Sequence, residues 1–438
     1  MNQQLQSFQR ISLETLQWFI FLLASSVAIP IVIGSVYELS FIEISGLMQR
    51  TFFVVGLACF LQGLMGHRLP IADGPAGIWI STFTIYAITA LQHGSSLRET
   101  LQVLETAMLL TGLFLVIFGV FRLSQKLITI FTPLVTGAFL FMLTIQLSGT
   151  FLEGMLGMSG DENVAQLDAA FIAFFVFFFV LGFSTFWRGP LKNYAVLIGI
   201  GIGWILDWII RGRETVEQSM PLVQFPEIFA WGLPKWDIGT LPIAFFIAII
   251  LLSNIVASLG AAGYVLKGEP SFRPQQMNKG SYTLGINHGL SALFSSVAVV
   301  TLASSSGFME LTGQRRKSPF MFASLLLVFV SLFPPIVSFV SMIPSPVANA
   351  ALLATFVQLM GIGLGNITSQ TLDQRKMTIL GITFLLGIGL MFMPSETFQG
   401  MPSIIQNVVG NGLLMGTILI ILLEQLWKED QAKDGKYK

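Results

Sequence analysis

The sequence predicts an all-α polytopic membrane protein with about fourteen transmembrane segments, arranged as two inverted halves of seven. The chain of 438 residues is 54% hydrophobic and only 11% charged, with a mean hydropathy of +0.77. A soluble chain of this length is not so apolar. Apolar stretches near the ~20 residues that cross a bilayer recur along the whole chain. Two of them are interrupted in equivalent positions of the two halves, as in many secondary transporters.

The predicted segments are windows of predominantly apolar residues. In order they span 13–37, 47–66, 69–90, 101–121, 128–148, 168–188, 192–210, 240–264, 281–297, 298–313, 318–342, 346–365, 376–393 and 403–427. An even number of crossings places both termini on one side. With this topology, eighteen of the 23 Lys and Arg residues lie on the side of the termini, which the positive-inside rule assigns to the cytoplasm. We therefore expect a multi-pass protein of the cell membrane with cytoplasmic N- and C-termini.

The longest polar interval inside the chain, 212–239, is predicted to be an extracellular linker. It separates a first repeat, 1–211, from a second repeat, 240–438. Seven crossings in each half give equivalent halves opposite orientations. The stretches PLVTGAFLFMLTIQLSG from Pro133 and PVANAALLATFVQLMG from Pro346 share a proline, a Gln-Leu pair and a closing glycine. This similarity is weak, but it has the spacing that an inverted repeat requires.

The third segment is interrupted at LPIADGPAG, from Leu69, and the tenth at LASSSG, from Leu302. Backbone without helical partners at membrane depth must face protein or a water-filled cavity. We expect a half-helix to begin near Pro75, which suits a first helical turn, and another near Ser305, capped by the serines at 304–306. Two such N-termini would suit a small ligand with carbonyl oxygens or negative charge. The alternative is two ordinary kinks that neighbouring helices satisfy.

Asp73 lies inside the third-segment break, directly before Gly74 and Pro75. It is the strongest candidate for a proton or cation partner. Ionisable side chains inside a membrane are energetically costly, and those that occur usually belong to a functional site. The alternative is a structural cap that accepts backbone N–H groups at the start of the half-helix.

Other chemistry is not predicted. The single cysteine, Cys59, excludes an internal disulfide and a cysteine-based metal cluster. The intramembrane His, Asp and Glu residues do not have metal-ligand spacing, so we expect no metal, no cofactor and no enzymatic activity. The charges balance at 23 against 23, which gives no basic excess for nucleic acid. The expected partners are the lipid bilayer and a small-molecule substrate.

Four stretches carry a resemblance to a known family: LQWFIFLLASSVAIPIVIG from Leu16, GHRLPIADGPAG from Gly66, TPLVTGAFLFMLTIQLSG from Thr132 and TLASSSGFMELTG from Thr301. They resemble the nucleobase/ascorbate transporters, also called the nucleobase cation symporter 2 family, which includes bacterial uracil and xanthine permeases. The resemblance implies core and gate domains built from both halves. It also implies that the third and tenth segments pair as short antiparallel strands, each followed by a half-helix, and that the protein is a homodimer.

The site that the resemblance implies departs from the family pattern. Two substrate-binding glutamates of the family are replaced by Asn254 in the eighth segment and Ser304 in the tenth. The third-segment aromatic residue is replaced by Gly77, with Trp79 as a nearby substitute. Asn and Ser cannot titrate, so these positions cannot carry the proton that a buried glutamate can. The substrate-binding residues implied in this way are Ser25, Gly77, Asn254, Ser258, Ala303, Ser304 and Ser305.

The resemblance implies a secondary active transporter for a nucleobase, purine or pyrimidine, that works by alternating access and is coupled to protons if Asp73 takes over that role. An amide both donates and accepts hydrogen bonds, whereas a carboxylate only accepts them. Asn254 can therefore bind a nucleobase edge, but with a different donor and acceptor pattern from that of a glutamate. The alternative is an anion or carboxylate transporter of the same fold, favoured by the missing glutamates, because fold alone does not choose the substrate.

Overall fold

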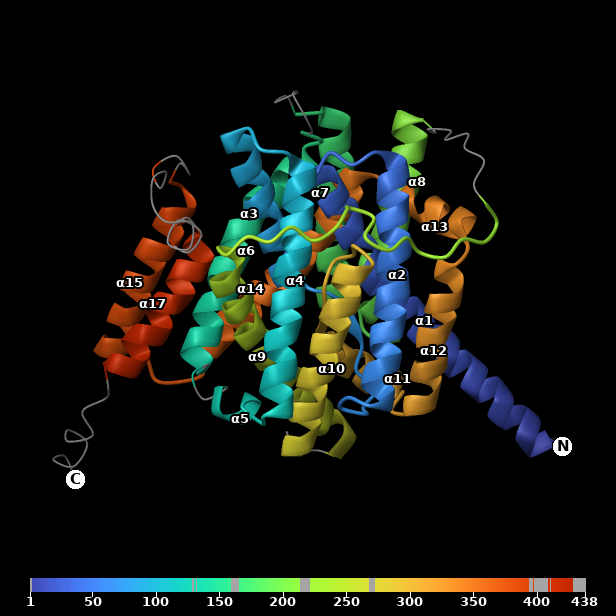
Figure 1. Cartoon of the computed structure of the whole chain (residues 1–438). Coiled ribbons are helices and arrows are strands. Elements are labelled where there is room, and N and C mark those ends of the chain that lie inside the picture. Colours follow the sequence, from blue (N-terminus) through green and yellow to red (C-terminus); the bar gives the residue numbers. More distant parts are fainter. Residues whose placement is uncertain are drawn as a thin grey trace.

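The computed structural model consists, in its described residues, of helices (Figure 1) that pack around a short two-stranded sheet. It describes residues 2–127, 130, 132–158, 165–212, 221–267, 272–393, 397, 409 and 411–427. Parts of the predicted linker and of the fifth and fourteenth segments, at 213–220, 128–129, 131, 403–408 and 410, lie outside the described residues.

The elements of the first half are α1 Asn2–Val36, α2 Phe41–Leu64, β1 Asp73–Pro75, α3 Gly77–His93, α4 Leu97–Val120, α5 Ser124–Leu127, α6 Pro133–Met155, α7 Leu167–Phe186, the 3-10 helix η2 Pro190–Tyr194 and α8 Ala195–Arg211. Those of the second half are α9 Thr240–Lys267, α10 Pro274–Leu293, β2 Val299–Thr301, α11 Ser304–Thr312, α12 Lys317–Ser331, α13 Pro334–Ser341, α14 Ser345–Thr368, α15 Gln374–Met391 and α17 Gly412–Leu426. The third and tenth segments are each a short strand followed by a helix, as predicted.

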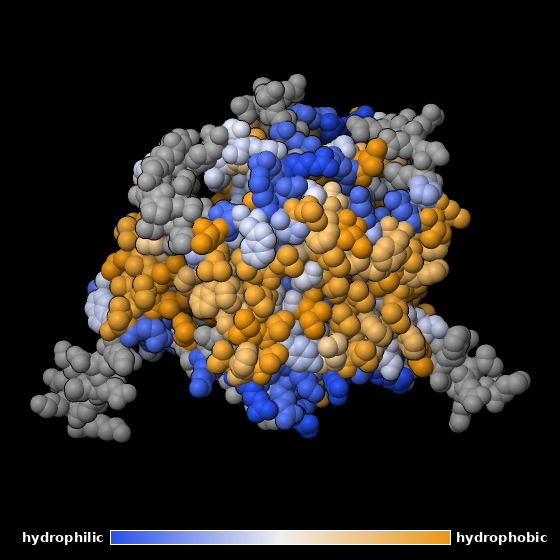
Figure 2. Space-filling model, viewed as in Figure 1, coloured by the Kyte–Doolittle hydropathy of each residue, from blue (hydrophilic) through white to orange (hydrophobic). Residues whose placement is uncertain are grey.

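The membrane crossings differ in length. Among the described residues, seven helices are long and apolar enough to cross a bilayer: α1, α2, α4, α6, α7, α9 and α14. The eleventh predicted segment is divided into α12 and α13, which are bent by 92° at their junction. The other predicted segments include the shorter apolar helix α17, the more polar helix α10, and α3 and α11, which each follow a strand. On the side of the molecule shown in Figure 2, a belt of apolar residues lies between two polar ends, as a bilayer-spanning protein requires.

The helices pack in two groups. In the first group, α4 packs on α10 and α9, and α2 packs on α12 and α1. In the second group, α6 packs on α14, α15 packs on α17, and α7 packs on α8 and α14. Each group contains helices from both halves of the sequence. The broken elements lie where the groups meet, since α3 contacts α6 and α11 contacts η2.

Paired glycines allow the closest helix contacts. A Cβ atom on Gly112 of α4 would lie 2.7 Å from the carbonyl oxygen of Gly285 on α10. In the second group, a Cβ atom on Gly137 of α6 would lie 2.6 Å from the carbonyl oxygen of Gly363 on α14. Because small residues let membrane helices approach closely, these positions set the distance between helices from opposite halves.

Substituting Gly137 by Ala should destabilise the protein, because the added methyl group meets the backbone of α14 rather than a side chain that can move. We expect a cost of about 1–3 kcal/mol, typical of overpacking, seen as a lower midpoint of thermal unfolding in detergent. Gly149→Ala is the matched control on the same helix, since a Cβ there has no atom within 4 Å. Equal unfolding midpoints for the two variants would contradict the proposed contact.

Candidate functional site

The centre of the candidate site is the antiparallel pair of β1 and β2. Asp73 pairs with Thr301, Gly74 with Val300 and Pro75 with Val299. The pairing continues at both ends of the sheet through backbone hydrogen bonds, Leu302 N to Ala72 O at 2.8 Å and Ala76 N to Ala298 O at 3.0 Å. All six strand residues are buried. Extended backbone at membrane depth is therefore satisfied by its symmetry-related counterpart rather than by water.

The two half-helices begin directly after the strands, two residues later than expected in the first case. Pro75 belongs to β1 and not to a helical turn, and α3 begins at Gly77 after Ala76. The other half-helix, α11, begins at Ser304 after Ala303. Neither Ala76 nor Ala303 makes a side-chain capping hydrogen bond, so the prediction that serines cap α11 was wrong.

Two of the predicted binding residues hold the broken segments together. Ser305 is buried, and its Oγ accepts a hydrogen bond from Ala72 N at 2.9 Å. Ser258 of α9 is also buried and donates to the Thr301 carbonyl oxygen at 3.0 Å. Both hydroxyl groups thus satisfy backbone next to the strand pair, where a lost partner costs about 1–3 kcal/mol.

Other predicted residues remain accessible near the start of the half-helices. Ala303 and Ser304 are exposed. Asn254 is half-buried and makes no hydrogen bond to another residue in the described part of the chain. Asn254 lies one turn before Ser258, so the two share the face of α9 that is directed at β2. The structure therefore brings a free amide to the side of the sheet from which α11 begins.

Ser25 and Gly77 border the same elements from other directions. Ser25 of α1 is half-buried, and its Oγ donates to the Leu22 carbonyl oxygen at 2.9 Å. That Oγ lies 3.7 Å from the position of a Cβ atom on Gly74, so Ser25 packs on β1. A Cβ atom on Gly77 would lie 3.5 Å from Cζ of Phe356 on α14. The start of α3 thus faces the second helix group.

Asp73 is fully buried, and its carboxyl group contacts α10. Its Oδ2 accepts a hydrogen bond from Asn287 Nδ2 of α10 at 3.0 Å. Its backbone N–H donates to Cys59 Sγ, whose thiol donates back to the Asp73 carbonyl oxygen, both at 3.2 Å. Asp73 does not cap α3, so that alternative was wrong, and the structure does not bring it into contact with Asn254 or Ser304.

Aromatic residues hold both half-helices from behind. Trp79 of α3 is fully buried, and its Nε1 donates to His288 Nε2 of α10 at 3.2 Å. On the other side, Trp18 of α1 packs on Phe308 of α11 with ring centroids 4.5 Å apart. Trp79, expected as a stacking partner for the ligand, is instead engaged with His288.

Sequence reasoning missed the contribution of α10. Asn287 and His288 bind Asp73 and Trp79, the polar residues of the first broken segment. The available signal was the polar composition of this segment, MNKGSYTLGINHGLSAL, which is unusual for a membrane helix. Among the described residues, no three His, Cys, Asp or Glu side chains are placed to hold a metal ion.

Two broken segments that meet at the boundary between helix groups of an inverted repeat define a membrane transporter. A family model described as the Permease family matches residues 9–396. The chain belongs to this family, and it is a multi-pass membrane permease rather than an enzyme.

Relatives match the chain over almost its full length. The protein YwdJ of Bacillus subtilis (strain 168) is 29% identical over 433 residues, which cover 97% of this chain and 98% of YwdJ. The uric acid permease PucK of the same organism is 23% identical, with coverage of 97% and 96%. The xanthine permease XanP of Escherichia coli (strain K12) is 24% identical, with coverage of 88% and 85%.

Solved structures have the same fold. The transmembrane domain of the cyanobacterial bicarbonate transporter BicA matches with a TM-score of 0.59 at 15% identity, covering 92% of this chain and 96% of that one. SLC26A9 matches with a TM-score of 0.64 at 14% identity, covering 96% of this chain and 66% of that one. At these identities the likeness shows the fold alone.

Adjacent serines at the start of α11 offer a test of the strand pair. Ser305→Ala should lower the free energy of unfolding by about 1–3 kcal/mol, because Ala72 N–H then loses its buried acceptor. Ser304→Ala, at the exposed neighbouring position, should leave stability within about 0.5 kcal/mol. Thermal unfolding of the two purified variants makes the comparison. A larger loss for the Ser304 variant would be incompatible with these contacts.

Proposed function

We propose that the protein is a secondary transporter for a nucleobase, in particular an oxopurine, and that it binds this substrate between α9, the start of α3 and the start of α11. The observation that carries the proposal is the free amide of Asn254 on the side of β2 from which α11 begins, together with two half-helix N-termini that have no side-chain cap. The relatives named as uric acid and xanthine permeases support the same substrate class.

The chemistry of this site suits an oxopurine. Such a ring has alternating carbonyl oxygens and N–H groups on its edge. The Asn254 amide can donate to one and accept from the other, and the positive ends of the helix dipoles at the two N-termini attract carbonyl oxygens. Ser304 adds an exposed hydroxyl group that also does both. Ala303 and Gly77 have small or no side chains, so a planar ligand can approach the backbone.

Transport would follow from movement of the second helix group relative to the first. In this proposal, α1–α4 and α9–α13 form a core that contains the strand pair, and α6–α8 with α14–α17 form the gate. The boundaries 1–211, 212–239 and 240–438 for first repeat, linker and second repeat belong to the same proposal. Gly77 at the core faces Phe356 at the gate, so a relative shift of the groups would open or close the substrate site.

Asp73 is proposed to couple transport to protons. Its carboxyl group lies in the strand pair that carries the half-helices and is held by Asn287. A change in its charge would act on β1 and β2 without direct contact to the substrate. We further propose a homodimer in the cell membrane with cytoplasmic termini, consistent with the distribution of Lys and Arg and with the family resemblance.

The competing function is anion transport, favoured by two half-helix N-termini that have no side-chain cap and by the fold shared with a bicarbonate transporter. Uptake of labelled xanthine into cells or proteoliposomes distinguishes the two. We expect uptake that unlabelled uric acid inhibits and that excess sulfate and bicarbonate do not. Asn254→Ala should raise the half-saturating xanthine concentration about tenfold, as expected for the loss of paired hydrogen bonds.

The matched control for Asn254→Ala is Ser253→Ala, because Ser253 Oγ is buried, unlike the accessible amide. This variant should keep the half-saturating xanthine concentration of the unmodified protein. Absence of xanthine uptake together with saturable uptake of sulfate or bicarbonate would replace the proposed function by the competing one.

The proposed role of Asp73 predicts the pH dependence of transport. In the unmodified protein, xanthine uptake should increase as the external pH falls. Asp73→Asn, which cannot change charge, should still bind xanthine but transport it at a rate that no longer varies with pH. Binding and uptake are measured between pH 5.5 and 8 with the same preparation. A variant with the pH dependence of the unmodified protein would remove Asp73 from the coupling mechanism.

A further inference from the structure

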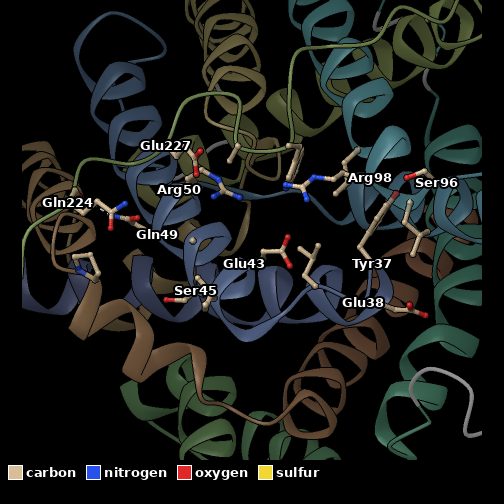
Figure 3. Close-up of a pocket in the computed structure, with 18 of the residues that line it drawn as sticks. Tyr37, Glu38, Glu43, Ser45, Gln49, Arg50, Ser96, Arg98, Gln224 and Glu227 are labelled. Atoms are coloured by element: carbon tan, nitrogen blue, oxygen red, sulfur yellow. Dashed lines mark hydrogen bonds between the residues drawn. The ribbon is translucent and has the colours of Figure 1, made fainter. Parts of the chain in front are cut away.

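A polar cavity of about 790 Å³ (Figure 3) lies on the face of the protein that we expect to be extracellular. It lies between the α1–α2 turn, the start of α4 and the segment 221–239. Its size is within the range of small-molecule sites, about 300–1,000 Å³. Residues of the candidate site do not line it.

The segment 221–239 is the described part of the predicted linker, and it is fixed across the outer ends of the first helix group. Three of its backbone N–H groups donate to backbone carbonyl oxygens of the helix group: Gln224 to Leu332, Phe229 to Leu293 and Lys235 to Gln102. The helices also bind it in return: Gln49 Nε2 donates to Gln224 O at 2.9 Å, and Thr106 Oγ1 to Lys235 O at 2.8 Å. The roof of the cavity is therefore an ordered part of the fold.

Arg50 is a buried cationic residue that lines this cavity. Its side chain is 5% exposed, and its Nε donates to the Ser295 carbonyl oxygen at 3.1 Å. Ser295 Oγ in turn donates to the buried carboxylate of Glu105. Glu105 and Glu227 both attract the Arg50 charge. A buried guanidinium held in this way has a fixed orientation and retains donors for a ligand.

The remaining polar groups are of both kinds, donors and acceptors. Figure 3 shows the guanidinium groups of Arg50 and Arg98 and the carboxylate of Glu43 directed into the same space. Glu38 and Glu227 also line the cavity. Three carboxylates against two guanidinium groups leave no positive excess for an inorganic anion. Donors and acceptors in the same cavity instead match a neutral planar heterocycle with carbonyl and N–H groups.

The wall of the cavity is aromatic and leads to α3. Tyr37 and Trp231 line the cavity. The Tyr37 hydroxyl group donates to the Phe83 carbonyl oxygen at 2.8 Å, and the Trp231 ring packs on the Phe83 ring at 5.8 Å between centroids. Phe83 packs on Trp79, two residues after the start of α3. A ligand against this wall would thus lie on residues that contact the half-helix of the candidate site.

We propose that this cavity is a second, outer binding site for an oxopurine, which holds the ligand by Arg50 and Arg98 before or while the inner site is occupied. The inference rests on the proposed function for the identity of the ligand, but its residues are different. The inner and outer sites can therefore be removed one at a time.

The test measures binding of labelled xanthine to the purified full-length protein by equilibrium dialysis. We expect two molecules of xanthine bound per chain and no displacement by excess sulfate. Arg98→Ala should weaken the outer site at least about tenfold, so that one molecule is bound at xanthine concentrations that fill only the intact inner site. Arg50→Lys should do the same, because Lys keeps the charge but loses the planar donor pattern. Asn254→Ala should weaken the inner site about tenfold and leave one molecule bound at the outer site under the same conditions.

The matched control is Arg315→Ala, an exposed cation between α11 and α12 that does not line the cavity; it should bind two molecules. One molecule bound per chain, lost in Asn254→Ala and unchanged in Arg98→Ala, would overturn the outer site and leave the proposed function standing. One molecule lost in Arg98→Ala, in a protein without xanthine uptake, would support the outer site and overturn the proposed function. Displacement of the Arg98-dependent molecule by sulfate would overturn the assignment to a neutral heterocycle.

Discussion

The structure depends on one constraint, the need to satisfy extended backbone in the middle of a membrane protein. Each unsatisfied backbone group in hydrocarbon costs several kcal/mol, and a three-residue strand alone has no partners. β1 and β2 solve this for each other, with Asp73 opposite Thr301 and Pro75 opposite Val299. Since one strand comes from each half of the chain, neither half can complete its broken segment alone. The inverted repeat is thus a condition for the site as well as a symmetry of the fold.

Satisfying this backbone uses side chains that otherwise resemble ligand-binding groups. Ser305 and Ser258 are polar, intramembrane and adjacent to the breaks, yet both bond to backbone next to the sheet. Ser304 and Asn254 have the same kind of chemistry, but Ser304 is exposed and the Asn254 amide has no partner among the described residues. Ser304 and Ser305 are neighbours on α11 and differ by about 100° in direction, so only Ser305 bonds to backbone beside the strand pair. Asn254 and Ser258 share a face of α9 and differ instead in their position along the helix, one turn apart. Residue type alone contains neither kind of information.

The sequence was sufficient for the architecture and much less so for the site. Hydropathy and paired interruptions predicted a helical polytopic membrane protein and the broken third and tenth segments, because bilayer thickness and backbone satisfaction restrict the choices strongly. The start of α3 was misplaced because Pro75 is equally compatible with a first helical turn and with a strand end. Asn287 and Gln102 were missed because their partners, Asp73 and Lys235, are more than one hundred residues away in sequence. Contacts across a pseudo-symmetric interface have no local pattern.

In the proposed mechanism, proton coupling and substrate recognition are carried by different residues, and the position of Asp73 gives a physical reason for this separation. A carboxylate in contact with the substrate must serve two purposes, hydrogen bonding and titration, so its charge state affects ligand affinity directly. Here the buried carboxylate binds Asn287 in the strand pair, while the accessible groups near the half-helices, Asn254 and Ser304, are neutral. Substrate affinity can then depend on neutral groups alone. A charge change at Asp73 would act through β1, whose position both half-helices share, and this requires the rigid connection that the paired strands provide.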